Sequence, residues 1–263
     1  MKLCMMTYTM ARQGYEVDDF IRTAVKNGLT GIDWVTTCGC DPKELKMRSD
    51  DAGLTVACHT FVCSKLTSGD EKWLDQVKQS IEDAYTLGAP VVMIPTGCNA
   101  EISREEFRKF WVDALVEIAP ITDDAGIILT IENFPGSASA FVTAADYYEA
   151  KAVIPQLKLT YDNGNAEFGE NTVESFKASA PDIVHAHFKD WRIIDHPEPG
   201  YRDSLVGKYF KPALIGQGDL DTVGCWNAMR DAGYEGYINI EYEGNKVPAD
   251  EAIAIAAEYL RSL

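Results

Sequence analysis

The chain has 263 residues and a formal net charge of −17, with 46% hydrophobic and 25% charged residues. This composition is typical of a folded globular protein that buries a large core. A surface this acidic repels phosphate backbones and anionic lipids, so the charge argues against nucleic acid and membranes as partners. No segment approaches the roughly 18 apolar residues of a membrane span, and the N-terminus lacks the pattern of a secretory signal.

The cysteines indicate a reducing compartment. Their number, seven, is odd, and only Cys38 and Cys40 are close neighbours in the sequence. Neither a disulfide framework nor a paired C-x-x-C zinc motif is therefore indicated. We expect buried free thiols and a cytoplasmic protein.

Strand-like and helix-like segments alternate along the chain. The predicted strands cover residues 2–7, 31–35, 54–60, 91–95, 127–132, 157–162, 183–189 and 237–242. The predicted helices cover residues 17–27, 41–52, 70–87, 103–124, 143–152, 171–180, 220–232 and 248–262. Several strands are apolar throughout, as parallel strands are when both faces of the sheet are covered. Five helix-to-strand junctions contain a glycine expected to end the helix in the left-handed conformation, at positions 28, 53, 88, 126 and 233.

Eight strands alternating with eight helices predict an α/β fold, a single (β/α)8 TIM barrel spanning residues 1–263. No G-x-G-x-x-G motif follows the first strand, which argues against an open dinucleotide-binding sheet. One connection, residues 190–219, is unusually long, and long loops inside compact domains often carry function. It places basic side chains on the face where barrel active sites form, namely Arg192, Arg202, Lys208 and Lys211.

Four predicted strands end in a side chain that can bind a metal ion: Glu132 in ILTIEN, Asp162 in LKLTYDN, His187 in IVHAHFKD and Glu241 in YINIEYEG. Because parallel strands end at the same face of a barrel, we expect these side chains to converge. Three carboxylates and one imidazole suit a divalent ion such as Mn²⁺, Mg²⁺, Co²⁺ or Zn²⁺. Taken singly, a strand-end glutamate can cap a helix and Asp-Asn-Gly is common in turns. The series of four favours a metal site.

The seventh strand carries His185, His187 and Lys189 at alternate positions, so their side chains point to the same side. Three polar groups in a row are hard to explain as packing. One would bind the metal, and the others would contact substrate or orient the ligand.

Further polar and aromatic side chains near the strand ends have two readings each. His59 ends the third strand, where it either contacts substrate or makes a structural hydrogen bond. Tyr8 and Trp34 lie near the ends of the first two strands, where they form an apolar wall or ordinary core. Glu243 follows Glu241 by two positions and is either a group at the rim of the site or a solvated loop acid.

Five local motifs carry a resemblance to a known family. They are IEN at the fifth strand, DNGN at the sixth, H-x-H-x-K-D at the seventh, IGQGDLD before the seventh helix and IEYEG at the eighth. With them the whole chain resembles the xylose isomerase-like TIM barrels of the sugar phosphate isomerase/epimerase superfamily, the AP endonuclease family 2 type. The resemblance implies one divalent metal ion held by Glu132, Asp162, His187 and Glu241. It also implies that the two glutamates move protons, as they do in the epimerase branch.

The chain departs from two members of that superfamily. Asn165 stands where the ketose 3-epimerases have a histidine three residues after the aspartate, so the match to that branch is incomplete. The fourth strand ends in IPTG, without the histidine that an endonuclease IV metal cluster requires. With the acidic charge, this argues against DNA repair.

We expect a metal-dependent isomerase or epimerase that moves a proton through an enediolate of a keto or aldo sugar. An alternative is a lyase or dehydratase acting on a keto sugar or a 3-keto-glycoside, including C-linked glycosides, with His185, Lys189 or His59 protonating the leaving group. A third reading is a non-catalytic sugar-binding subunit. The expected partner is a small-molecule sugar, without phosphate because no glycine-rich phosphate cradle is evident, and a homo-oligomer is compatible with the sequence. The expected substrate contacts are Tyr8, His59, Asn165, His185, Lys189 and Arg192.

Overall fold

Eight parallel strands form a closed barrel in the computed structural model, which describes residues 1–263. Around the barrel the strands follow the order β1-β11-β7-β6-β5-β4-β3-β2. The predicted (β/α)8 barrel is confirmed, and each predicted strand is present to within two residues at either end. The strands are β1 (Lys2–Met6), β2 (Gly31–Val35), β3 (Thr55–Thr60), β4 (Val91–Ile94), β5 (Ile128–Glu132), β6 (Lys158–Asp162), β7 (Ile183–Phe188) and β11 (Tyr237–Ile240).

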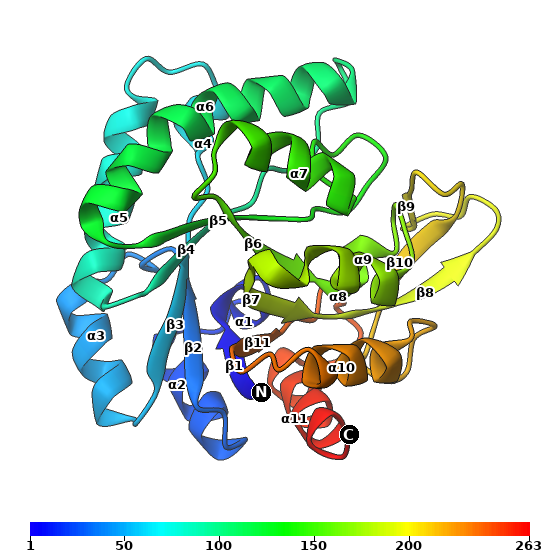
Figure 1. Cartoon of the computed structure of the whole chain (residues 1–263). Coiled ribbons are helices and arrows are strands. Elements are labelled where there is room, and N and C mark those ends of the chain that lie inside the picture. Colours follow the sequence, from blue (N-terminus) through cyan, green and yellow to red (C-terminus); the bar gives the residue numbers. More distant parts are fainter.

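Helices cover the outside of the barrel, as Figure 1 shows. The eight predicted helices correspond to α2 (Val17–Lys26), α3 (Pro42–Asp51), α5 (Trp73–Leu87), α6 (Arg104–Ala125), α7 (Ala144–Val153), α9 (Thr172–Ser179), α10 (Thr222–Asp231) and α11 (Ala249–Arg261). Short helical segments that the sequence pattern did not predict are α1 (Thr7–Ala11), α4 (Ser64–Thr67), α8 (Asn163–Ala166) and the 3-10 turn η1 (Ala180–Asp182). Single turns are too short to show a helical period.

Helix boundaries follow from local capping. The five glycines expected at the junctions all have positive φ, between 61° and 73°. Gly88 and Gly126 cap α5 and α6 directly in the left-handed conformation. At its other end α6 starts with a capping box, in which Ser103 and Glu106 each accept the other's backbone N–H.

One continuous hydrophobic cluster, from Leu3 in the first strand to Leu260 in the last helix, packs the helices on the sheet.

The segment 190–219 is not the structureless loop expected from its length. It forms a separate antiparallel sheet, here called the insert sheet, of β8 (Asp190–Ile194), β10 (Tyr209–Ala213) and β9 (Arg202–Asp203). In Figure 1 this sheet stands beside the mouth of the barrel. A small aromatic cluster anchors it, in which Phe210 stacks on Phe168 with ring centroids 4.0 Å apart and Trp191 packs edge-on. The sequence pattern did not predict these strands, because DWRII and YFKPA are short and mix polar with apolar residues. They lack the apolar run by which the barrel strands were predicted.

Asp190 ties the insert sheet to the chain before α10. Its carboxylate accepts backbone N–H groups from Trp191, Gly216, Gly218 and Leu220, at 2.8, 3.0, 2.9 and 3.3 Å. A Cβ atom at Gly218 would lie only 2.0 Å from Asp190 Oδ1, so this close approach requires glycine. The aspartate of H-x-H-x-K-D and the glycines of IGQGDLD therefore form one structural unit.

The structure shows where the seven cysteines lie and whether any helix could span a membrane. All seven cysteines are free; four are buried as expected, whereas Cys38 and Cys98 are exposed and Cys40 is half-buried. The expectation of buried thiols is wrong for these three, because Cys38 and Cys40 lie after β2 and Cys98 after β4, in loops at the mouth rather than in strands. None of the helices combines the length and the apolar character needed to cross a membrane.

Replacing Asp190 with alanine should destabilise the protein by about 3 kcal/mol, because it leaves several backbone N–H groups at a buried position without an acceptor. Urea denaturation measures the loss, and hydrogen exchange should increase first between residues 214 and 220. The matched control is Asp231→Ala at an exposed aspartate, where the change should be below about 1 kcal/mol. Equal effects of the two substitutions would contradict the anchoring role.

Candidate active site

The four predicted metal ligands converge at the carboxyl ends of their strands. One ligand atom from each of Glu132, Asp162, His187 and Glu241 lies within 4.8 Å of the others, and none of the four residues is more than 5% exposed. His187 Nδ1 lies 2.8 Å from Glu132 Oε1 and 3.4 Å from Glu241 Oε2. We call these four residues the acidic cluster. The sequence-based expectation that they meet at one place agrees with this geometry.

The strand register explains why they meet. Asp162 pairs directly with His187 between β6 and β7, and Glu132 lies level with Thr160 between β5 and β6. Asn133, the last residue of the IEN motif, fixes the neighbouring strand end. Its side chain donates to the Asp162 carbonyl and accepts the Asp162 N–H, each at 2.8 Å.

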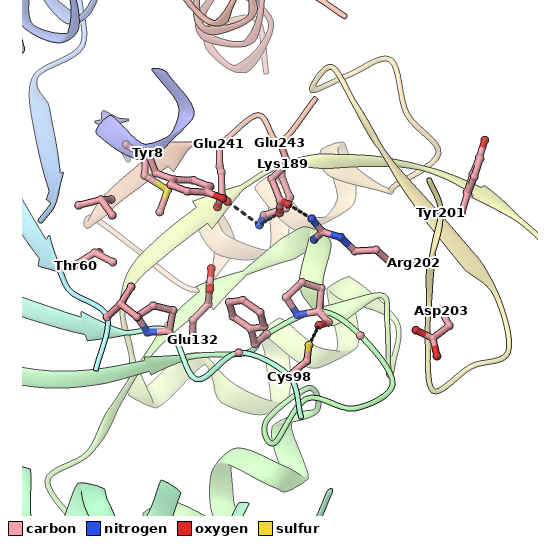
Figure 2. Close-up of a pocket in the computed structure, with 18 of the residues that line it drawn as sticks. Tyr8, Thr60, Cys98, Glu132, Lys189, Tyr201, Arg202, Asp203, Glu241 and Glu243 are labelled. Atoms are coloured by element: carbon pink, nitrogen blue, oxygen red, sulfur yellow. Dashed lines mark hydrogen bonds and ion pairs between the residues drawn. The ribbon is translucent and has the colours of Figure 1, made fainter. Parts of the chain in front are cut away.

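Lys189 provides the positive charge next to the acidic cluster (Figure 2). Its Nζ lies 3.2 Å from Asp162, 3.0 Å from Glu241 and 2.9 Å from Glu243. Burial alone would lower the pKa of Lys189, but these carboxylates raise it well above its usual value, so the ammonium stays charged. Glu243, for which the sequence left two readings, is a partly buried partner of Lys189 at the rim of the site and not a solvated loop acid.

The acidic cluster carries more negative charge than the protein compensates. Burial, with Glu132 and Glu241 nearby, raises the pKa of Asp162 well above its usual value in spite of Lys189. Burial also opposes the charge of Glu241, yet Lys189 and His187 together lower its pKa to about 2. Asp162 Oδ2 and Glu241 Oε2 are buried and make no hydrogen bond, although Lys189 Nζ lies 3.2 Å from the first and His187 Nδ1 3.4 Å from the second. Carboxylate oxygens without hydrogen bonds, excess negative charge and an imidazole are what a divalent cation binds, so the four residues fit the ion that the family resemblance implies.

A cavity of about 660 Å³ opens above the acidic cluster. Glu132 and Glu241 reach it, as do Lys189 and Tyr8, whereas Asp162 and His187 lie beneath its floor. The insert sheet and its loops form one side through Pro197, Glu198, Tyr201, Arg202, Asp203 and Tyr209. The rest of the lining is mostly apolar, with Met6, Val35, Val62, Met93, Pro95, Phe134 and Pro135.

Four residues expected to contact substrate do not line this cavity. His59 is 1% exposed, and its Nδ1 lies 2.9 Å from the carbonyl oxygen of Trp34, the structural hydrogen bond that the sequence left as one option. Asn165 is buried beside Asp162 and donates its backbone N–H to that carboxylate. Arg192 points away on β8, where it pairs with Asp219. His185 lies beneath the acidic cluster.

The sequence analysis missed two residues of the site. It gave no role to Asp33, and it named Arg192 as a substrate contact although the arginine that lines the cavity is Arg202. Asp33 lies on β2, facing the two histidines of β7. The signal was present, because a charged residue in the buried strand GIDWV needs a partner. Arg202 reaches the cavity from β9, and its choice over Arg192 depends on the pairing within the insert sheet, which the sequence pattern did not reveal. Trp34, the possible wall residue, is a core aromatic with no exposed surface.

Comparison with known proteins identifies the class. The family of xylose isomerase-like TIM barrels matches residues 21–263, so the chain belongs to this family. Inosose dehydratase of Geobacillus thermodenitrificans is 23% identical over 238 residues, covering 83% of this chain and 78% of that enzyme. Inosose isomerase of Bacillus subtilis is 26% identical over 211 residues, covering 77% and 73%. Protein MJ1311 of Methanocaldococcus jannaschii is 27% identical, and the match spans 70% of this chain but only 61% of that protein.

Solved structures share the whole fold. The probable 3-DHS dehydratase AsbF of Bacillus anthracis superimposes with a TM-score of 0.81 at 19% identity, covering 99% of both chains. The IOLI protein, whose structure contains a bound zinc atom, gives a TM-score of 0.80 at 21% identity, covering 99% of this chain and 96% of that one. At this identity the likeness establishes the fold alone. The two relatives from the sequence comparison whose names state an activity are an inosose dehydratase and an inosose isomerase.

Asp162→Asn and His187→Ala should each lower the affinity for a divalent ion by 10-fold or more, because each removes a ligand of the acidic cluster. Calorimetric titration of the metal-free protein with Mn²⁺ and Zn²⁺ measures this. Asp203→Asn, at a cavity acid outside the cluster, is the control and should leave the affinity unchanged. Wild-type affinity in both cluster variants would show that the metal does not bind there.

Proposed function

We propose that this protein is a divalent-metal-dependent sugar isomerase or epimerase acting on a keto or aldo sugar. The main observation in support is that only two of the four residues in the acidic cluster, Glu132 and Glu241, reach the cavity. They come from β5 and β11, on either side of β6 and β7 in the barrel order. Figure 2 shows the two carboxylates reaching the cavity from different sides, so they would face a bound substrate from two sides. This arrangement suits removal of a proton from one face and its return from another.

The chemistry begins with a weakly acidic C–H bond next to a carbonyl group. A divalent ion at the acidic cluster would polarise that carbonyl and stabilise the negative charge that develops on its oxygen. Glu241, which Lys189 and His187 keep in the ionised form, is one of the two proton carriers. Glu132, 2.8 Å from His187 Nδ1, is the second proton carrier. Return of the proton to the same carbon gives epimerisation, and return to the neighbouring carbon gives isomerisation.

The cations of the cavity indicate a substrate without phosphate. Only Lys189 and Arg202 line it with positive charge. Lys189 is surrounded by three carboxylates, and Arg202 pairs with Glu243 at 2.5 Å while its guanidinium lies over the Trp191 ring. Neither is free to pair with a phosphate group, so the proposed substrate is an uncharged sugar. The relatives named as acting on inosose, an uncharged cyclic ketone, support this choice.

Glu132→Gln should lower turnover by about 100- to 10,000-fold, because the amide cannot transfer a proton in the same way. The substitution is nearly isosteric, so circular dichroism should report an unchanged fold. Glu198→Gln, at an exposed acid on the cavity edge, is the matched control and should retain activity. The assay is exchange of the substrate's carbon-bound hydrogen in D₂O, followed by NMR for a panel of keto and aldo sugars. Full exchange activity in Glu132→Gln would contradict the assigned role.

A second candidate is a lyase acting on a keto-glycoside, including C-linked ones. The size and apolar lining of the cavity favour it, since about 660 Å³ exceeds what a monosaccharide of roughly a dozen heavy atoms needs and is of the order that drug-sized ligands occupy. Of the three acids considered for the leaving group, only Lys189 lines the cavity; His59 and His185 do not. The leaving-group proton would then come from Lys189.

Product analysis by NMR in D₂O separates the candidates. An isomerase or epimerase should incorporate deuterium and conserve the mass of the sugar skeleton, whereas a lyase should release an aglycone or water. Lys189→Met should abolish release of the aglycone if Lys189 protonates it, while Tyr201→Phe, which removes a hydroxyl at the cavity edge, should not. A protein that retains no divalent ion and turns over no sugar would instead support a non-catalytic sugar-binding subunit.

A further inference from the structure

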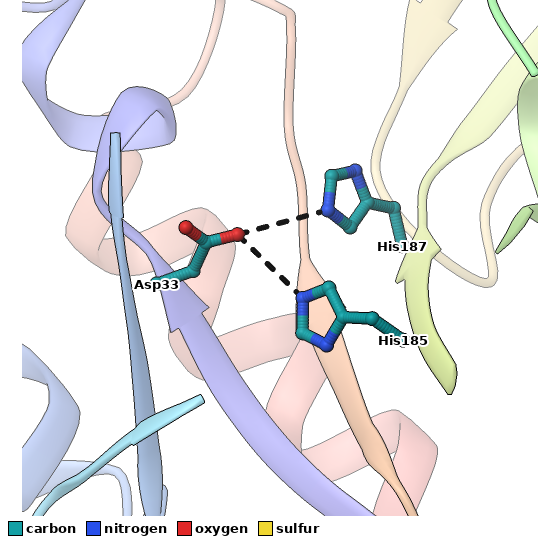
Figure 3. Close-up of side chains that lie close together, drawn as sticks. All are labelled: Asp33, His185 and His187. Atoms are coloured by element: carbon teal, nitrogen blue, oxygen red, sulfur yellow. Dashed lines mark ion pairs between the residues drawn. The ribbon is translucent and has the colours of Figure 1, made fainter. Parts of the chain in front are cut away.

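A buried aspartate faces the acidic cluster from across the barrel. Asp33 on β2 has no exposed surface, and its Oδ2 lies 3.5 Å from His185 Nε2 and 3.8 Å from His187 Nε2 (Figure 3). Strands β2 and β7 are not neighbours, since β1 and β11 separate them in the barrel order. The contact therefore crosses the interior and belongs to tertiary structure, not to a strand pair.

Two neutral donors hold this carboxylate in place. Thr60 on β3 donates its hydroxyl to Oδ1 and Oδ2 at 3.1 and 3.2 Å, and the Asn239 amide on β11 donates to Oδ2 at 2.7 Å. Although burial opposes the charged form, the two facing imidazoles keep the pKa of Asp33 well below its usual range. The interior thus contains a fixed negative charge whose open side faces β7.

His187 has its two ring nitrogens in different surroundings. Nδ1 points to Glu132 and Glu241, whereas Nε2 is buried, has no hydrogen-bond partner and faces Asp33. A neutral imidazole carries one N–H, and a ring that binds metal through Nδ1 must carry it on Nε2. In this structure Nδ1, 2.8 Å from Glu132 Oε1, donates to that carboxylate. A metal ion bound at Nδ1 would displace that proton and leave the single N–H on Nε2, which faces Asp33 at 3.8 Å, less than about 1 Å beyond hydrogen-bond distance.

We propose that Asp33 is a positioning residue that accepts the Nε2–H of His187 and so keeps its Nδ1 lone pair directed at the acidic cluster. Carboxylates that accept the second ring N–H of a metal-binding histidine fix its tautomer and make it a stronger ligand. His185 Nε2 lies 3.5 Å from the same Oδ2, on the same side of the carboxylate as His187. The inference rests on the proposed metal-dependent function.

A competing reading is that Asp33, His185 and His187 hold an ion of their own, since one atom of each lies within 4.8 Å of the others. The amide of Asn239 and the hydroxyl of Thr60 point their hydrogens at Asp33, which suits an anion accepting N–H groups better than one bound to a cation. None of the three residues lines the cavity, which gives such an ion no direct access. The positioning role is therefore favoured.

The test is Asp33→Asn in the full chain, with two readouts that do not depend on activity. Calorimetric titration with Mn²⁺ should show a 10- to 100-fold loss of affinity at unchanged stoichiometry. NMR of ¹⁵N-labelled imidazoles in the Zn²⁺-loaded protein, with the His187 signals assigned through His187→Gln, should show a hydrogen-bonded Nε2–H in the wild type. Its proton should resonate further downfield than in Asp33→Asn, and Asp33→Glu, which retains a carboxylate, should recover the shift and the affinity at least in part.

The matched control is Asp182→Asn, the same change at another buried aspartate, which is paired with Lys151 and Lys158 away from the site. It should cost stability without changing metal affinity or the His187 Nε2–H signal of the Zn²⁺-loaded protein. If Asp33→Asn does not fold, His185→Gln with Asp33 intact supplies the comparison and should keep the hydrogen-bonded Nε2–H signal.

The outcomes separate this inference from the proposed function. A wild type that binds metal, with an Asp33→Asn variant that binds it as tightly, overturns the positioning role alone. A wild type that binds no divalent ion overturns the proposed function and the positioning role together. A wild type that binds two equivalents, one of which Asp33→Asn loses, overturns the positioning role in favour of a second ion.

Discussion

The site depends on negative charge that the fold buries without full compensation. Glu132, Asp162 and Glu241 meet at the barrel mouth, where burial leaves them little access to water and only Lys189 and His187 lie close enough to offset their charge. Buried carboxylates that are not paired either bind a proton or bind a cation. The raised pKa of Asp162 is the first response, and binding of a divalent ion is the second. The electrostatic cost of burying this cluster would thus be the source of the metal affinity that we propose.

The barrel keeps this arrangement in place because each acid is fixed by backbone geometry. Asp162 is bonded through its backbone to the Asn133 side chain, and the Glu241 N–H donates to the Phe188 carbonyl at 2.9 Å. A cluster of like charges carried on flexible loops would move apart. When the strands themselves carry the charges, the stability of the closed sheet holds them together, and the hydrophobic core offsets the cost.

Much of the fold and the centre of the site could be predicted from the sequence, for reasons that are local. Apolar runs ending in Glu132 or His187 mark both a strand and the point where it leaves the core, and parallel strands guarantee that such ends lie on one face. Contacts across the barrel have no such local signal. Asp33 meets His187 only because the sheet closes, and Arg202, not Arg192, lines the cavity only because β9 pairs with β10 in the insert sheet. His59 and Asn165 end or follow strands as ligands do, but their side chains turn into the packed interior.

Charges alternate from the barrel interior to the rim, and this links the insert sheet to the acidic cluster. Asp33 faces His187, His187 contacts Glu132 and Glu241, Glu241 pairs with Lys189, and Lys189 pairs with Glu243. Glu243 in turn binds Arg202, the residue by which β9 reaches the cavity. Each buried group has an oppositely charged or hydrogen-bonding neighbour on the next level, so moving one changes the electrostatic environment of the next. The insert sheet is therefore electrostatically coupled to the glutamates that would carry the proton, although it contributes no residue to the acidic cluster.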